Sequence, residues 1–205
     1  AEKSLYSTAI YHHQQALVYK QEGKFDQAKA AFETAARASD GYLQRFPRSK
    51  NAYEMEFYLA ECLYNSFQFA EAGEHYAHVR DSSQDVKYRA DAAYAAVLSV
   101  QKQLDADIKN GVGKSYPVLK STDRPEGESV SPIALSKLET ALVSSSDKYV
   151  ESVKAGDDKA PGIAYRAAEL FYTHNQFDEA RKRFESIVTN FPKNEVAKFS
   201  TNLII

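Results

Sequence analysis

The 205-residue sequence has no tryptophan, one methionine and one cysteine, Cys62. A single cysteine excludes an intramolecular disulfide and a zinc site built from several cysteines. No run of about 18 apolar residues is present, so we expect no membrane-spanning segment. The 26 basic and 28 acidic side chains nearly balance. The net charge therefore gives no attraction toward nucleic acid or an anionic membrane surface, and neither is an expected partner.

The sequence does contain an internal repeat. Segment 165–187 matches segment 57–79 almost position for position, and a third copy lies upstream of both. The matched pairs of the first two are Phe57/Tyr165, Ala60/Ala168, Glu61/Glu169, Tyr64/Tyr172, Phe69/Phe177, Ala72/Ala180, Tyr76/Phe184 and Val79/Ile187. In the upstream copy the corresponding residues are Ala16, Tyr19, Gly23, Phe25, Ala28, Phe32 and Ala35.

The spacing within each copy predicts two antiparallel helices. Ala72, Tyr76 and Val79 fall on one stripe of a helix, and small residues on both helices allow close approach. We expect the ring of Phe25, Phe69 or Phe177 to fill the elbow between the helices. This pattern resembles the tetratricopeptide repeat over residues 11–35, 53–79 and 164–192, without that family's tryptophan and with alanine at position eight. The resemblance implies an all-α, right-handed superhelical solenoid.

Capping and helix-breaking residues predict where the helices begin and end. We expect one helix over Lys3–Glu22, stopped by Gly23, and a second from Asp26 to Pro47. Ser49 or Asn51 can cap the next helix, and Glu54 follows Asn51 at the spacing of a capping box. Ser82 or Ser83 can cap a helix over 85–108. Ser131-Pro132 and Pro161 predict two further helix starts, the first helix running to about Lys154. The expected organisation is one array over 1–205, with repeats at 3–46, 49–80, 85–154 and 161–192 and the start of a further, broken-off repeat at 194–205.

A long loop interrupts the third repeat at 111–131. Its prolines, glycines and scattered charges bury little, so we expect it to be poorly ordered and dispensable for stability. Within it, GVGKS at 111–115 looks like the end of a phosphate-binding loop. The required earlier glycine is replaced by Ile108, so we do not expect a nucleotide site.

Few side chains suggest chemistry. His75 and His78 lie three apart on one helix face and could bind a metal together with an outside carboxylate, but two imidazoles alone are too few, and a solvated surface is expected. Glu61 and Glu169 recur by repeat symmetry, which favours a surface role, and Cys62 is expected to be a small buried thiol. We therefore predict no catalytic, cofactor or metal site and no enzyme activity.

The resemblance also implies a concave groove, lined by the first helix of each repeat, that binds a peptide or helix of a protein partner. An alternative is that its aromatic side chains are buried against a neighbouring helix or loop. Leu17 and Glu61 occupy positions that differ from the basic clamp with which some cytosolic co-chaperones hold a carboxylate. The residues placed in the groove are His13, Leu17, Lys20 and Gln21, then Phe57, Glu61, Tyr64 and Asn65, then Tyr165, Glu169, Tyr172 and Thr173.

A narrower resemblance concerns the junctions between repeats. Two junctions share a motif in which an aromatic residue, proline, any residue and then serine or asparagine precede an alanine-containing helix. The two segments are FPRSKNAYEMEFYLAECLYN and FPKNEVAK. This phrase is similar to tetratricopeptide proteins of the bacterial envelope, of the BamD-like and CpoB-like kinds, and more weakly to those of gliding motility. It implies a periplasmic scaffold of an assembly or motility complex, although a lipid-anchoring cysteine motif is not seen. Alternatives are a cytoplasmic location, or a docking domain of a larger enzyme, transport or secretion subunit.

Overall fold

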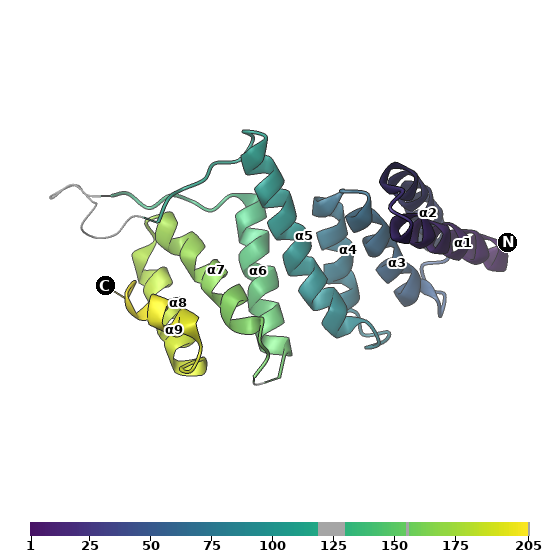
Figure 1. Cartoon of the computed structure of the whole chain (residues 1–205). Helices are drawn as coiled ribbons and strands as arrows, with labels where there is room; N and C mark the ends of the chain where they lie inside the picture. The colour runs from purple at the N-terminus through teal and green to yellow at the C-terminus, as the bar shows by residue number, and fades with distance from the viewer. Residues whose placement is uncertain (119–129, 155, 205) are drawn as a thin grey trace. The chain divides into compact units, whose positions relative to one another are not determined.

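The computed structural model describes residues 1–118, 130–154 and 156–204, and within these ranges it contains nine helices and no strand (Figure 1). The all-α prediction is confirmed. The chain divides into two compact units, Ala1–Gln103 and Leu104–Ile205, which we describe separately. A single array over both units stays a prediction. None of the described helices combines the length and the apolar character that crossing a membrane requires.

Unit 1 is built from helices that pack in chain order. α1 (Glu2–Gln21) packs on α2 (Phe25–Arg45), α2 on α3 (Ala52–Asn65), and α3 on α4 (Phe69–Asp81) (Figure 1). The first turns of α5 (Arg89–Lys109) add Ala92 and Ala96 to the same core. The predicted bounds of the first two helices are confirmed to within a residue or two.

Small residues and rings form the core of unit 1 as the repeat predicts. Ala16, Ala60 and Ala72 are fully buried, so neighbouring helix backbones approach closely at these points. Phe32 and Tyr76, at equivalent positions of two repeats, fill the space beside them. The alignment of the repeats therefore identifies the buried face of each helix correctly.

The turn between paired helices has the same geometry in each copy. Gly23, Phe67 and Asn175 all adopt positive φ, at 73°, 68° and 59°. The next residue in each copy bonds its N–H to a carbonyl five residues back, as in Gln68 N to Leu63 O at 2.9 Å. This pattern ends a helix by satisfying its last carbonyls, and it favours glycine or asparagine. Gly23 is confirmed as a stop.

Three predictions about helix ends and elbows in unit 1 are wrong. The ring of Phe25 is 72% exposed and does not fill an elbow, whereas Phe69 contacts Tyr64. Glu54 does not close a capping box at α3, because tyrosine hydroxyls hydrogen-bond to its carboxylate instead. Helix α5 begins at Arg89 rather than 85, because the Asp85 carboxylate accepts hydrogen bonds from the next two amides and forms a turn.

Unit 2 contains α6 (Lys137–Ser152), α7 (Ala160–Thr173), α8 (Phe177–Asn190) and α9 (Glu195–Thr201), which pack in chain order (Figure 1). Pro161 lies in the first turn of α7, as predicted. The core between α7 and α8 consists of the residues that the repeat matches: Ala168, Tyr172, Ala180, Phe184 and Ile187.

The start of α6 differs from the prediction. The helix begins at Lys137, where Ser136 and Glu139 form a capping box, and not at Ser131-Pro132. The segment before α6 instead forms a hydrogen bond to the turn between α7 and α8, in which Ile133 N donates to His174 O at 2.8 Å. Described ends of the long loop also pack, since Tyr116 contacts the ring of His174. Residues 119–129 of the predicted 111–131 loop lie outside the described residues, so the expected disorder of this loop stays a prediction.

Candidate partner-binding site

Three of the predicted groove residues, Lys20 of α1 and Glu61 and Asn65 of α3, are linked on one face of unit 1. Lys20 Nζ donates to Asn65 Oδ1 at 2.7 Å, and Asn65 Nδ2 donates to Glu61 O at 2.8 Å. The first bond ties the C-terminal turns of the two helices together, and the second lies within α3 and holds the Asn65 side chain. Lys20 meets a neutral amide oxygen, and within the described residues it forms no ion pair. Its ammonium group remains available to an acidic or carbonyl group of a ligand.

His13 lies beneath this face rather than on it. Its side chain is 8% exposed, and its ring contacts those of Phe32 and Tyr58. Nε2 of His13 lies 3.3 Å from Glu61 Oε2, but the two atoms are not aligned for a hydrogen bond. The buried imidazole of α1 and the partly exposed carboxylate of α3 are therefore close neighbours without a hydrogen bond between them.

The two aromatic groove candidates of α3 have different environments. Phe57 is buried, with its ring stacked on Tyr88 at 4.2 Å between centroids and an edge contact to Tyr76. Phe57 therefore belongs to the core, which agrees with the alternative that the groove aromatics are buried against a neighbouring helix or loop. Tyr64 is partly exposed and contacts Phe69, and burial raises the pKa of its hydroxyl. Of these two rings, Tyr64 is therefore the one that a partner can reach.

In unit 2 the corresponding residues lie on α7. Tyr172 is buried against Phe177 and Phe184, so it is a core residue like Phe57. Tyr165 is partly exposed, and burial, followed by the charge of Glu169, raises its pKa. Glu169 pairs with Arg166, and the Thr173 hydroxyl donates to the backbone carbonyl of Glu169. Tyr165, Glu169 and Thr173 thus stay accessible on this helix.

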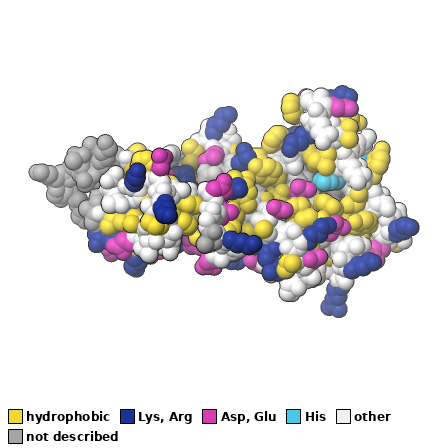
Figure 2. All heavy atoms as spheres, turned by 60° about the horizontal axis from the view of Figure 1, so that its bottom comes forward, with side chains coloured by type: hydrophobic (Ala, Val, Ile, Leu, Met, Phe, Trp, Pro, Cys, Tyr) yellow, Lys and Arg dark blue, Asp and Glu magenta, His cyan; other side chains and the backbone are white. Residues whose placement is uncertain are grey.

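Hydrophobic side chains also reach the surface of unit 1 among charges of both signs, as Figure 2 shows. Leu17 is 38% exposed, on the same helix as Lys20. Phe67, at the turn that follows Tyr64 and Asn65, is 66% exposed despite its size and its positive φ. A bulky residue in this backbone conformation is unusual and costs stability, which makes the turn a functional candidate.

Sequence reasoning missed a cluster of tyrosines around Glu54. Its carboxylate accepts hydrogen bonds from Tyr6 and Tyr88 at 2.8 and 2.9 Å, and Lys87 Nζ lies 3.2 Å away. Burial alone would raise the pKa of Glu54, but these three hydrogen bonds outweigh it and lower the pKa. Tyr58, one turn along α3, is a local donor, but the other donors come from α1 and from the segment before α5, so no local pattern could have shown the cluster.

A second missed pair lies inside unit 2. Glu139 and His174 are both buried, with Oε1 and Nε2 3.3 Å apart. His174 Nδ1 lies 2.7 Å from the carbonyl oxygen of Leu170, which can only accept, so Nδ1 carries a proton. The Ser-x-x-Glu spacing from Ser136 to Glu139 would have predicted the cap of α6, although not the contact with His174.

A third cluster joins α3 to α4. Glu56 Oε1 lies 2.7 Å from His75 Nδ1 and 3.1 Å from His78 Nδ1. Phe57, the neighbour of Glu56, contacts Tyr76, the neighbour of His75, so the register of the two antiparallel helices places Glu56 opposite the histidines. By contrast Cys62 is buried and free as expected, and burial raises the pKa of its thiol.

Comparison with protein families matches residues 164–194 to the tetratricopeptide repeat. The matched span contains most of α7, all of α8 and the turn between them. This helix pair is therefore similar to a tetratricopeptide repeat. The pairs α1–α2 and α3–α4 share its spacing and turn geometry, so the fold as a whole is tetratricopeptide-like. A comparison with curated proteins found no match. Tetratricopeptide repeats generally mediate protein–protein interaction, and proteins that contain them are typically scaffolds without enzymatic activity.

Proposed function

We propose that this chain is a protein-interaction scaffold that holds a segment of a partner protein against the face formed by α1 and α3. The tetratricopeptide repeat supports the general role. The observation that carries the site is the Lys20–Asn65 hydrogen bond, which joins the two helices at the surface. Lys20 lies one turn after Leu17 on α1 and Asn65 follows Tyr64 on α3, so the bond links the two helices at the residues proposed to bind. A pre-ordered surface loses less entropy on binding.

The chemistry of this face suggests what kind of segment it takes. Tyr64 and Leu17 offer apolar area, and tyrosine supplies a large contact at low rotamer cost. Lys20 adds one cation with free hydrogen-bonding capacity. The expected ligand is a short segment with an apolar side chain and a nearby acceptor. Glu61, already paired with His13, is expected to affect the association rate more than the affinity.

The proposed setting is the periplasm of a bacterial cell, within an envelope assembly or motility complex. The junction phrases FPRSKNAY and FPKNEVAK support this setting through their similarity to envelope tetratricopeptide proteins. Cell fractionation of the native protein tests it directly. We expect the protein to be recovered with periplasmic markers. Recovery with cytoplasmic markers would overturn the proposed localisation but would leave the proposed interaction role unaffected.

Site-specific photocrosslinking tests the interaction face. A photoreactive residue at Leu17 is expected to capture a discrete partner in cells, whereas one at the exposed Glu185 of α8 is not. Tyr64→Ala should reduce the Leu17 crosslink at least tenfold, because truncating a central ring of an interface costs on the order of 2 kcal/mol. Tyr11→Ala, an exposed ring elsewhere on α1, is the matched control and should leave the crosslink intact.

These results separate the possible outcomes. An unchanged circular dichroism spectrum of Tyr64→Ala shows that the loss is not due to unfolding. If Glu61→Gln abolishes the crosslink and Tyr64→Ala does not, the face binds a basic ligand electrostatically. If neither Leu17 nor Tyr64 positions crosslink and Glu185 does, the α1–α3 face is not the binding site.

A further inference from the structure

The α3–α4 helix pair brings together three side chains of the kind that bind transition metals. His75 and His78 lie one turn apart on α4, and Glu56 approaches them from α3. Their nearest ligand atoms, two Nδ1 and one carboxylate oxygen, all lie within 4.8 Å of one another. The two histidines were too few for a metal site by sequence alone. The fold supplies the missing carboxylate.

The distances suit a tetrahedral ion. Zn²⁺ binds imidazole nitrogen and carboxylate oxygen at about 2.0–2.2 Å, which places neighbouring ligand atoms about 3.3 Å apart. Glu56 Oε1 is already 2.7 and 3.1 Å from the two nitrogens. Small side-chain movements would therefore admit an ion between them. His78 is 69% exposed, so solvent can reach the fourth position.

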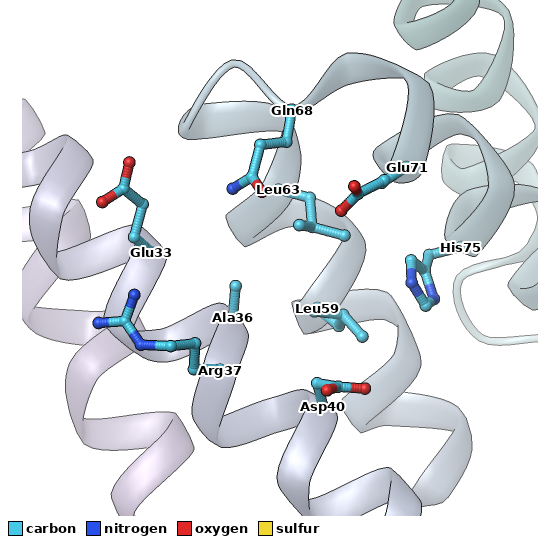
Figure 3. Close-up of a pocket in the computed structure, with 9 residues that line it drawn as sticks. All are labelled: Glu33, Ala36, Arg37, Asp40, Leu59, Leu63, Gln68, Glu71 and His75. Carbon is cyan, nitrogen blue, oxygen red and sulfur yellow. The ribbon is translucent and has the colours of Figure 1, made fainter.

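The electrostatic surroundings of His75 also favour a cation. His75 lines a cavity of about 400 Å³ together with Glu33, Asp40 and Glu71, against one cation, Arg37 (Figure 3). Asp40 reaches this cavity from α2 and Glu71 from α4, and both charges act on His75. A site with net negative charge raises the local concentration of cations.

A plain ion-pair network explains this arrangement less well. In that reading both imidazoles donate a proton to the same oxygen atom of Glu56, although a carboxylate offers two oxygens. Nothing in such a network requires His78, whose side chain is mostly in solvent. A divalent metal ion would take the place of both protons and would accept one lone pair from each imidazole.

We propose that Nδ1 of His75, Nδ1 of His78 and Oε1 of Glu56 form a binding site for a single divalent transition-metal ion of the Zn²⁺ type. Three protein ligands leave a fourth position open to water or to a group from another molecule, as in zinc sites that are not purely structural. The ion ties α3 to α4 and so stabilises this repeat. Two of the three ligand atoms are imidazole nitrogens, so the site disfavours Mg²⁺ and Ca²⁺, which prefer oxygen ligands.

The pH dependence follows from the ligands. Each imidazole must be unprotonated at Nδ1 to bind the ion, so protons compete with it. Binding should therefore weaken steadily as the pH falls from about 8 toward 6.

Calorimetric titration of the tag-free full chain with ZnCl₂ tests the site. The wild type should bind one Zn²⁺ saturably, with no saturable heat from MgCl₂. His78→Ala and Glu56→Gln should each weaken binding at least tenfold, whereas His78→Cys should retain it because thiolate is a zinc ligand. His12→Ala, a histidine of α1 outside the cluster, is the matched control and should bind like the wild type.

Thermal unfolding provides the second readout. Zn²⁺ should raise the Tm of the wild type and of His12→Ala, and it should leave His78→Ala unchanged. His78→Ala decides the question even if Glu56→Gln fails to fold, since its exposed ring contributes little to packing. The proposal is overturned if the wild type shows no saturable Zn²⁺ binding, or if His78→Ala binds and is stabilised as the wild type is.

Discussion

Phe67 and Asn175 occupy the same position in two helix pairs, and both adopt a left-handed backbone conformation, with φ of 68° and 59°. Asparagine tolerates this conformation, while a bulky side chain such as phenylalanine is strained there. The ring of Phe67 is mostly exposed and touches Phe69 at 6.0 Å between centroids. Packing therefore does little to offset the strain.

Replacing Phe67 with glycine is expected to stabilise the protein by about 0.5–1 kcal/mol, because glycine adopts positive φ without steric cost. Phe67→Ala removes the ring but keeps the strain, so it should be less stable than Phe67→Gly by about 1 kcal/mol. Urea denaturation followed by circular dichroism measures both. Equal stability of the two variants would mean that the ring, and not the backbone, determines the effect.

Ala72→Leu is expected to destabilise the protein by about 1–3 kcal/mol, because Ala72 is fully buried where α4 meets α3 and has no room for a larger side chain. Ala70→Leu, two residues away on the exposed face of α4, is the matched control and should change stability by less than about 0.5 kcal/mol. Thermal denaturation compares them. Similar melting of all three proteins would contradict the repeat alignment.

Glu139→Leu is expected to destabilise the protein by about 3 kcal/mol, because it leaves the buried Nε2 of His174 without its charged neighbour and removes the cap of α6. The amide of Ile133, which bonds to the His174 carbonyl, should lose protection from hydrogen exchange. Glu151→Leu on the exposed side of α6 is the control. Retained protection at Ile133 together with unchanged stability would show that the buried pair is dispensable.

The Glu54 cluster predicts a loss of stability in acid. The pKa of Glu54 is lower in the folded chain than its ordinary value near 4.5. The folded state therefore binds fewer protons here than the unfolded state, and the contribution of Glu54 is present above pH 4.5 and lost as the pH falls through the folded pKa. Urea denaturation between pH 3 and 7 should show a shallower acid loss for Glu54→Gln than for the wild type. Parallel pH profiles of the two proteins would refute the assignment.

The helix pairs could be predicted from the sequence because their determinants are local. Alanine and aromatic spacing sets which face of a helix is apolar, and Gly23 and Pro47 mark where helices stop. Such signals act within one or two turns of the chain. They located the core positions Ala60 and Ala72 correctly, and they predicted a thiol at Cys62 that is buried in the structure.

Only the tertiary structure decided which of the equivalent side chains remain accessible. Phe57 is buried because Tyr88, from the segment before α5, stacks on it, while Tyr64 on the same helix stays partly exposed. Periodicity defines a face toward a helix's own partner, but not what the next helix or loop covers. For the same reason Glu56 meets His75 and His78 only once α3 and α4 pair, since side-chain contacts across a turn depend on the register that core packing sets.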